Sequence, residues 1–271
     1  EETDANDLAP VTKLLLKIKQ LVFSRPSSRI IFMTATPQGL LCSEKNDWIM
    51  LWKHPFKNYC GVSLDKENTN ISVICNIREP KQNCPVKSRW TGDSNDRYNT
   101  FRPAVLQTVT EFCDLASKDS GVVQLCLLSL EHLCDAQLRL ALFVRSIIES
   151  MGKSSEVGIL VFNGLMREKE TLASLVKKSG RKKIVVISGM MASRGVSFTD
   201  FSDTDNKFEL VSQCHYTKTT TPLNSAMQAM RIFGPQRRTV NKPVLYTNVV
   251  GYSDMLKNFR ESYRICKDIA E

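Results

Sequence analysis

The stretch that decides the fold is residues 157–187, which read V-G-I-L-V-F-N-G-L-M-R-E-K-E-T-L-A-S-L-V-K-K-S-G-R-K-K-I-V-V-I. Two apolar runs, at 157–162 and 184–187, flank an amphipathic segment at about 168–178 and a basic turn. The apolar runs have the length of buried strands, and the segment between them has a helical period. Strand, helix and strand in this order predict two parallel strands joined by a crossover helix.

The same alternation extends in both directions along the chain. The apolar strands predict a sheet that is buried on both faces, because helices cover both. We therefore predict an α/β fold in which a parallel sheet has helices on both faces. Residues 38–100 are irregular apart from one strand, and they predict a linker with long loops. The further helices are predicted at 11–23, 103–117, 135–151 and 222–233, and the further strands at 29–33, 71–77, 122–130, 210–214 and 244–249.

Composition narrows the class of protein. The chain has 271 residues, 42% of them hydrophobic and 24% charged, as expected for one large or two smaller globular domains. The net charge of +9 is compatible with a polyanionic partner. Nine cysteines include no C-x-x-C pair, which argues against a zinc framework and predicts reduced thiols in an intracellular compartment. No apolar run reaches about 18 residues, so we expect no membrane partner.

Residues 228–238, Q-A-M-R-I-F-G-P-Q-R-R, carry the strongest candidate for a site. We predict that Thr221 caps the preceding helix and that Gly234 ends it in a left-handed conformation. Gln228 and Arg231 then share a face with Asn224, and arginines fixed near a helix end suit the capture of phosphate. The alternative is a solvated basic face. The core face of this helix is predicted to comprise Leu223, Met227, Met230 and Phe233.

Two loops are predicted at the carboxyl edge of the sheet, where open α/β sheets place their ligands. T-A-T-P at 34–37 follows one predicted strand, and S-R-G-V-S-F at 193–198 follows another. Gly189 and Gly195 flank the second loop, where backbone N–H groups suit the approach of a phosphate. The G-K-S at 152–154 is not a phosphate loop, because Ile147 stands where the first glycine is required and a helix precedes it.

These stretches together resemble superfamily 2 helicases. T-A-T-P at 34–37, S-R-G-V-S-F at 193–198 and Q-x-x-R-x-x-G at 228–234 are similar to motifs III, V and VI, in that order, and I-L-V-F-N-G at 159–164 resembles motif IV. In the residues of these motifs, the chain is most similar to the helicase-like domain of a group of bacterial endonucleases. A looser likeness is to the origin-binding helicases of large DNA viruses. The resemblance spans residues 1 to about 250 and implies a RecA-like sheet.

The resemblance implies ATP and Mg²⁺ as cofactors and nucleic acid, DNA above all, as the partner. E-E-T-D at 1–4 resembles the acidic box, with Glu1 at the metal position, where the family has Asp, and Glu2 as a catalytic residue. Arg231 and Arg237 are implied to act on the γ-phosphate, although Pro235 makes the spacing after Gly234 unusual. The resemblance further implies nucleotide contacts by Gln228, Gly195 and Ser197. It implies that Thr34 and Thr36 couple ATP hydrolysis to movement. The implied nucleic-acid contacts are Asn163, Gly164, Gly189, Met190 and Ser193.

The resemblance also implies a domain organisation. Residues 1–55 are expected to be the tail of a first RecA-like ATPase domain, residues 56–100 a linker, and residues 101–271 the second RecA-like domain. Because the chain has no G-x-x-x-x-G-K-[ST] motif, the phosphate loop is expected in an upstream domain. Two alternatives remain. One is a helicase-like nucleic-acid-binding or scaffold module without hydrolysis, and the other is a small-molecule α/β domain in which the motifs are accidental.

Overall fold

The computed structural model describes residues 59–60, 71–78, 100–163, 170–189, 196–203, 205–232, 234–235, 240 and 242–270, together with residues 17 and 24. By its contacts the chain divides into two compact units, Glu1–Trp48 and Ile49–Glu271. Every element named below lies in the second unit. The helix predicted at 11–23 and the strand predicted at 29–33 fall outside the described residues, apart from residue 17, which is helical.

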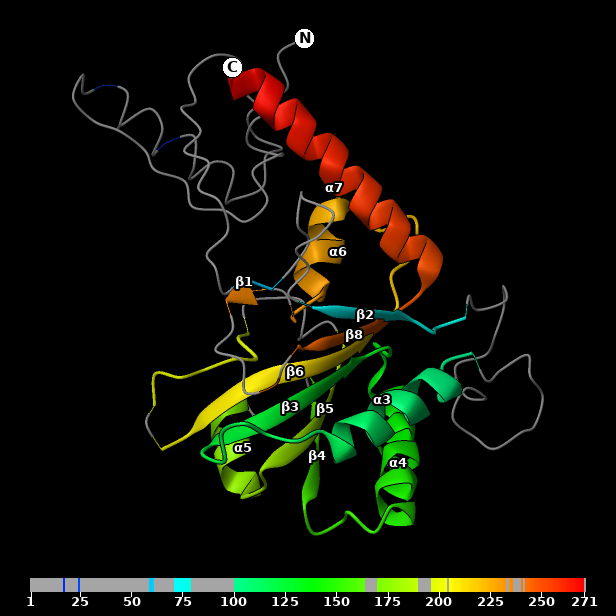
Figure 1. Ribbon diagram of the computed structural model, residues 1–271, viewed down its shortest axis with the longest axis vertical. Helices are drawn as coiled ribbons and strands as arrows, with labels where there is room; N and C mark the ends of the chain where they lie inside the picture. The colour runs from blue at the N-terminus through cyan, green and yellow to red at the C-terminus, as the bar shows by residue number, and fades with distance from the viewer. Residues whose placement is uncertain are drawn as a thin grey trace. The chain divides into compact units, whose positions relative to one another are not determined.

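Six strands form one sheet in the spatial order β2-β8-β6-β3-β5-β4 (Figure 1). All five neighbouring pairs are parallel. The predicted α/β fold with a parallel sheet is therefore confirmed, and the arrangement is of the RecA-like type. The strands are β2 (Ser72–Cys75), β3 (Val122–Ser129), β4 (Val157–Phe162), β5 (Lys183–Ser188), β6 (Lys207–His215) and β8 (Val244–Thr247).

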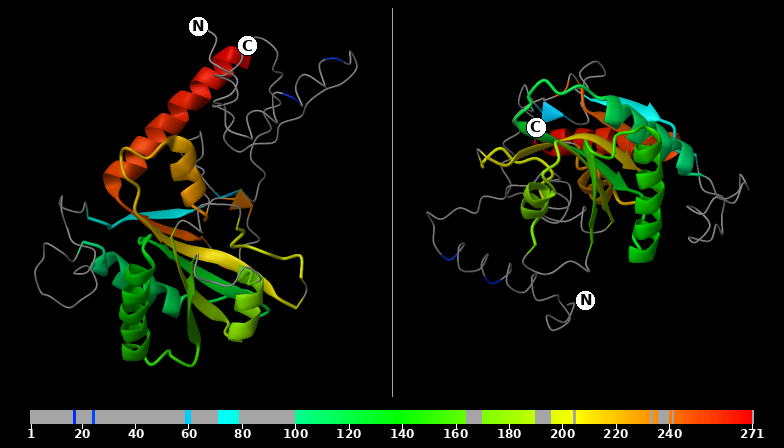
Figure 2. Two further views of the ribbon diagram at one scale, coloured as in Figure 1. Left: turned by 180° about the vertical axis from the view of Figure 1, so that it is seen from behind. Right: turned by 90° about the horizontal axis from the view of Figure 1, so that it is seen from below.

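One face of the sheet is covered by α3 (Arg102–Asp114) and α4 (Cys134–Ser150) (Figure 2). Helix α3 has a proline in its first turn, where the missing N–H costs least. The two helices pack Val105, Phe112 and Leu140 against alternate residues of the strands. This layer is dry, because these side chains are at most 2% exposed.

The other face is covered by α5 (Leu172–Ser179), α6 (Leu223–Ala229) and the start of α7 (Val249–Ala270). Helix α5 begins at a capping box in which the Thr171 side chain and the Ser174 backbone N–H are 3.1 Å apart. It ends at Gly180, whose φ of 60° is the left-handed conformation that glycine adopts readily. The prediction of helices on both faces is confirmed.

Two elements differ from the sequence prediction, one in where it ends and the other, the strand predicted at 71–77, in the sheet that it joins. The strand predicted at 244–249 ends at Thr247, and Val249 instead begins the 22-residue helix α7, for which no element was predicted. Strand β2 comes from the range 56–100 that the sequence assigned to a linker, yet it pairs with β8 at the edge of the main sheet. The sheet of the second unit therefore draws on residues before position 101.

The helix predicted at 222–233 is wrong at both ends. Its N-cap is Pro222, with no side-chain cap from Thr221, and α6 already ends at Ala229. Gly234 does not terminate it, because residues Gly234–Pro235 form the short strand β7, which pairs antiparallel with β1 (Tyr59–Cys60). Arg231 consequently lies beyond the helix rather than on a helical face shared with Gln228. Of the predicted core face, Met230 is buried and Leu223 partly buried.

No helix in the described part of the chain is both long and apolar enough to cross a membrane.

Candidate functional site

The carboxyl ends of the parallel strands meet at one edge of the sheet, and two of the predicted nucleic-acid residues lie there. Asn163 directly follows β4, and Gly189 directly follows β5. Because β4 and β5 are neighbours in parallel register, with Phe162 beside Ser188, the two residues are brought together at this edge. The edge is named the carboxyl edge below.

Gln137, in the first turn of α4, joins Asn163 to the loop after β3. The Asn163 side-chain amide donates to Gln137 Oε1 at 3.0 Å, and Gln137 Nε2 donates to the carbonyl of Glu131 at 3.0 Å. Asn163 is 8% exposed and Gln137 is 1% exposed. The Asn163 side chain therefore links the end of β4, through Gln137, to the loop after β3.

Gly189 is a glycine because the loop after β3 passes directly over it. A Cβ at this position would lie 2.6 Å from the Glu131 carbonyl oxygen and 2.8 Å from Gln137 Nε2. Neither atom has room for a methyl group. Close packing is by itself a reason for glycine here, and the approach of a phosphate at Gly189 stays a prediction.

A second polar group lies on β3 and β6 at the same edge. Ser129 Oγ lies 3.1 Å from His215 Nδ1 and accepts a hydrogen bond of 3.1 Å from Gln213 Nε2. All three residues are at most 9% exposed. Burial lowers the pKa of His215 to about 4, a larger effect than the hydrogen bond with the Ser129 backbone, which raises it. His215 is therefore neutral at pH 7 and serves the hydrogen-bond network rather than as a charge.

Arg231 is the predicted phosphate-binding arginine that lies within the described residues, and the structure shows its contacts. Its guanidinium donates to the carbonyl of Val196, within the predicted loop at 193–198, and to the carbonyl of Gln228 at 3.4 Å. The side chain is half-buried, and burial lowers its pKa from that of a free guanidinium. The segments that resemble motifs V and VI are thus in direct contact.

Two further predicted nucleotide contacts lie close to Arg231 in the chain or in space. Ser197 adjoins Val196, and its hydroxyl donates to the Thr199 carbonyl at 2.6 Å, which makes a local turn. Gln228 is exposed in the last turn of α6. The remaining predicted site residues lie outside the described residues: Glu1, Glu2, Thr34, Thr36, Gly164, Met190, Ser193, Gly195 and Arg237.

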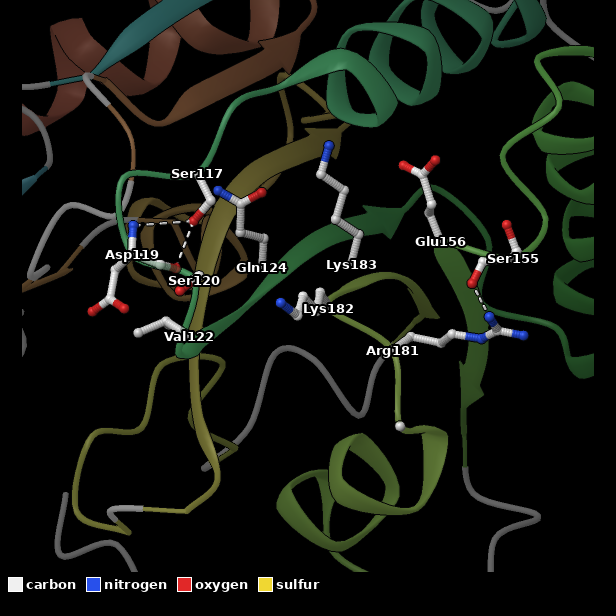
Figure 3. Close-up of a pocket in the computed structure, with 11 residues that line it drawn as sticks. Ser117, Asp119, Ser120, Val122, Gln124, Ser155, Glu156, Arg181, Lys182 and Lys183 are labelled. Atoms are coloured by element: carbon white, nitrogen blue, oxygen red, sulfur yellow. Dashed lines mark hydrogen bonds between the residues drawn. The ribbon is translucent and has the colours of Figure 1, made fainter.

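The opposite edge of the sheet holds a cleft of about 420 Å³ with a basic rim (Figure 3). Helices α3, α4 and α5 all end at this edge, so their carbonyl ends face it. Lys183 Nζ donates to the carbonyls of Phe112 and Cys113 at 3.3 and 2.6 Å, and Arg181 donates to that of Ser155. Lys183 thus offsets the negative end of α3, and Arg181 binds the turn that follows α4.

The G-K-S at 152–154 belongs to that same edge. It follows the end of α4, with Gly152 at a φ of 68°, and Lys153 pairs with Glu156 at 3.2 Å. A phosphate loop instead precedes a helix and offers its N-terminal N–H groups. The sequence-based rejection of this stretch as a phosphate loop is confirmed.

The buried glutamines Gln137 and Gln213 were missed by sequence reasoning. The signal for Gln213 was present, because S-Q-C-H at 212–215 is polar at the end of an otherwise apolar strand. Among the described residues, no three His, Cys, Asp or Glu side chains come together as metal ligands would.

No protein-family model matches the sequence, and no curated protein is significantly similar to it.

Proposed function

We propose that this chain is the second RecA-like domain of an ATP-dependent nucleic-acid motor, a helicase or translocase that acts on DNA. In this proposal it supplies an arginine to ATP and Mg²⁺ held by an upstream RecA-like domain. It also grips the nucleic-acid backbone along the carboxyl edge of its sheet. The described residues fit the arginine-bearing half of such a nucleotide site, because Arg231 is available there. They do not supply the phosphate loop, because the G-K-S at 152–154 follows a helix instead of preceding one.

The observation that carries the proposal is the placement of Arg231. Its side chain is half-buried and is oriented by the Val196 carbonyl, and its backbone neighbours Ala229 and Ile232 bind Gln213, near the carboxyl end of β6. A guanidinium has five N–H donors, so two carbonyl acceptors leave donors for a phosphate. A pre-oriented guanidinium from a second domain stabilises the charge that develops on a transferred phosphoryl group.

Nucleic-acid binding is supported by cations that begin at the same edge. Arg78 follows β2 and Lys218 follows β6, and both are exposed. Helix α7 starts where β8 ends and carries exposed Lys257, Arg260 and Arg264 at helical spacing. Contacts of this kind are to phosphates, so the proposed binding is nearly independent of sequence.

The experiment is a titration of labelled single-stranded DNA with the chain at several salt concentrations. We expect the logarithm of the affinity to fall linearly with the logarithm of salt concentration, by about 0.7 for each phosphate contacted. Lys218→Ala should reduce this slope by about 0.7, while Lys118→Ala should leave it unchanged. Both lysines are exposed, but Lys118 lies in the loop before β3, at the opposite edge. A slope that is zero, or that both variants reduce equally, contradicts the proposal.

A second candidate is a scaffold that binds nucleic acid without hydrolysis. It is favoured by the bonds of Arg231 to two backbone carbonyls, since a purely structural arginine makes the same bonds. The two candidates differ in a polypeptide that joins this chain to a phosphate-loop domain. For the motor, Arg231→Ala lowers ATP turnover about 10³-fold or more there. For the scaffold, no nucleic-acid-stimulated turnover is present to lose.

A further inference from the structure

Gln213 is a buried side chain near the carboxyl edge whose amide makes three hydrogen bonds. It lies on β6 with 0% of its surface exposed. Its Nε2 donates to the Ala229 carbonyl at 2.8 Å and to Ser129 Oγ at 3.1 Å, and its Oε1 accepts from the Ile232 N–H at 3.0 Å. One amide thus ties β6 to β3 and to the segment that follows α6.

The two backbone groups that Gln213 binds stand on either side of Arg231. Ala229 is the last residue of α6, and Ile232 comes three residues later. A helix end leaves backbone groups without helical partners, which need bonds from elsewhere when they are buried. Gln213 provides these bonds from a neighbouring strand. Together with the Arg231 N–H, which donates to the Ala229 carbonyl at 3.0 Å, Gln213 satisfies these backbone groups.

We infer that Gln213 is the positioning residue of Arg231. The amide fixes the backbone from which the arginine side chain departs, and the Val196 carbonyl fixes the guanidinium at the far end. With both ends held, the long side chain has one preferred orientation before any ligand arrives. What Arg231 acts on rests on the proposed function, whereas the anchoring of Arg231 does not.

The network behind Gln213 makes this anchor rigid. Ser129 Oγ accepts from Gln213 and also lies 3.1 Å from His215 Nδ1 and 3.4 Å from the Cys214 carbonyl. Strands β3 and β6 are adjacent in the sheet, so the serine cannot move without disturbing the ladder. A buried network in which every member is bonded specifies one arrangement.

The chain contains its own control in Gln124. This glutamine lies on the neighbouring strand β3 and is 1% exposed, but neither of its amide atoms has a hydrogen-bond partner. It lies towards the opposite edge, beside Lys183 in the register of β3 and β5. Gln124→Met therefore makes the same chemical change as Gln213→Met, the loss of a buried side-chain amide, without breaking a side-chain hydrogen bond.

The experiment compares Gln213→Met with Gln124→Met by two NMR measurements on the whole chain. One is hydrogen exchange at the Ile232 amide, and the other is the side-chain Nε–H signal of Arg231, assigned with Arg231→Lys. In Gln213→Met we expect exchange at Ile232 to accelerate about tenfold or more, the scale of one buried hydrogen bond. The Arg231 signal should shift towards that of a solvated arginine. Gln124→Met should change neither.

Gln213→Glu provides a second test, which does not depend on the folding of the methionine variant. A protonated carboxyl group can donate to the Ala229 carbonyl and accept from the Ile232 N–H, as the amide does. An ionised carboxylate has no proton to donate, so one of its oxygens would face the Ala229 carbonyl oxygen, and both are acceptors. The Arg231 signal should therefore match wild type at low pH and depart from it as the pH rises.

Two results overturn the inference. In the first, Gln213→Met has a lower thermal stability, but its hydrogen exchange at Ile232 and its Arg231 signal are the same as in Gln124→Met. Gln213 would then be only structural. The other is an Arg231 signal in Gln213→Glu that does not depend on pH. Neither measurement involves nucleotide or nucleic acid, so the failure of the proposed function is distinguishable from the failure of this inference.

Discussion

Gly189→Ala is the substitution whose effect follows most directly from the geometry of the carboxyl edge. The new Cβ would lie 2.6 Å from the Glu131 carbonyl oxygen, whereas ordinary contact begins at 3.4 Å, so one of them must move by about 0.8 Å. The Gln137 amide, 2.8 Å away, must move as well. The obstacle is largely backbone, so it cannot rotate aside.

The cost has two parts. Overpacking of this kind destabilises by about 1–3 kcal/mol, and the displaced bond from Gln137 to the Glu131 carbonyl is worth about 1 kcal/mol. We therefore expect a loss of about 3 kcal/mol. For a unit of this size that corresponds to a fall in Tm of roughly 6–12 °C.

The assay is thermal unfolding followed by circular dichroism, with Gly158→Ala as the matched control. A Cβ at Gly158, within β4, meets Arg181 Cγ at 3.1 Å, and that exposed side chain can shift at the cost of its hydrogen bond with the Ser155 carbonyl. The control should stay within about 1 kcal/mol of wild type. Equal Tm values for Gly189→Ala and Gly158→Ala would refute the close packing over Gly189.

Three other predictions concern separate parts of the chain. Gly251→Ala should unfold the start of α7, because a Cβ there overlaps the Thr217 carbonyl; far-ultraviolet circular dichroism would show the lost helix, and an unchanged spectrum would contradict the packing. Stability should fall as the pH drops from about 6.5 to about 4, by up to about 1.4 kcal/mol per pH unit, since unfolded His215 takes up a proton that the buried side chain, with its pKa near 4, does not. In urea unfolding, the free energy of unfolding of His215→Asn should depend less on pH over that range than that of wild type. An identical pH dependence would mean that other groups cause the effect. Residues 1–271 alone should not hydrolyse ATP above the rate of an Arg231→Ala control, because catalysis needs a phosphate loop.

The strands were the most predictable part of the fold. Apolar runs such as 157–162 and 184–187 favour a strand inside a sheet, and they are too short for a long helix, so local sequence was sufficient to predict them. The end of β8 was harder, because Val249 and Val250 continue an apolar run although they begin α7 with 57% and 46% of their surface exposed. Hydrophobicity alone does not distinguish an exposed helix start from the end of a strand.

The end of α6 was not predictable from the local sequence. Gly234 is a strong local stop signal, but the helix ends five residues earlier, where Gln213 binds the Ala229 carbonyl. The partner lies 16 residues away in the chain, so no window around the helix contains it. Sequence reasoning therefore selected Arg231 but placed it on the wrong element.

Which edge of the sheet single-stranded DNA contacts is the most direct test of the proposed nucleic-acid interface. Backbone amide signals of Gly189 and Lys218 report on the carboxyl edge, and those of Gly180 and Lys182 report on the basic cleft opposite. On titration with an oligonucleotide, we expect the first pair of signals to shift in a salt-dependent way and the second pair to stay in place. Shifts confined to Gly180 and Lys182, or no shifts at low salt, would contradict the placement of a nucleic-acid interface at the carboxyl edge.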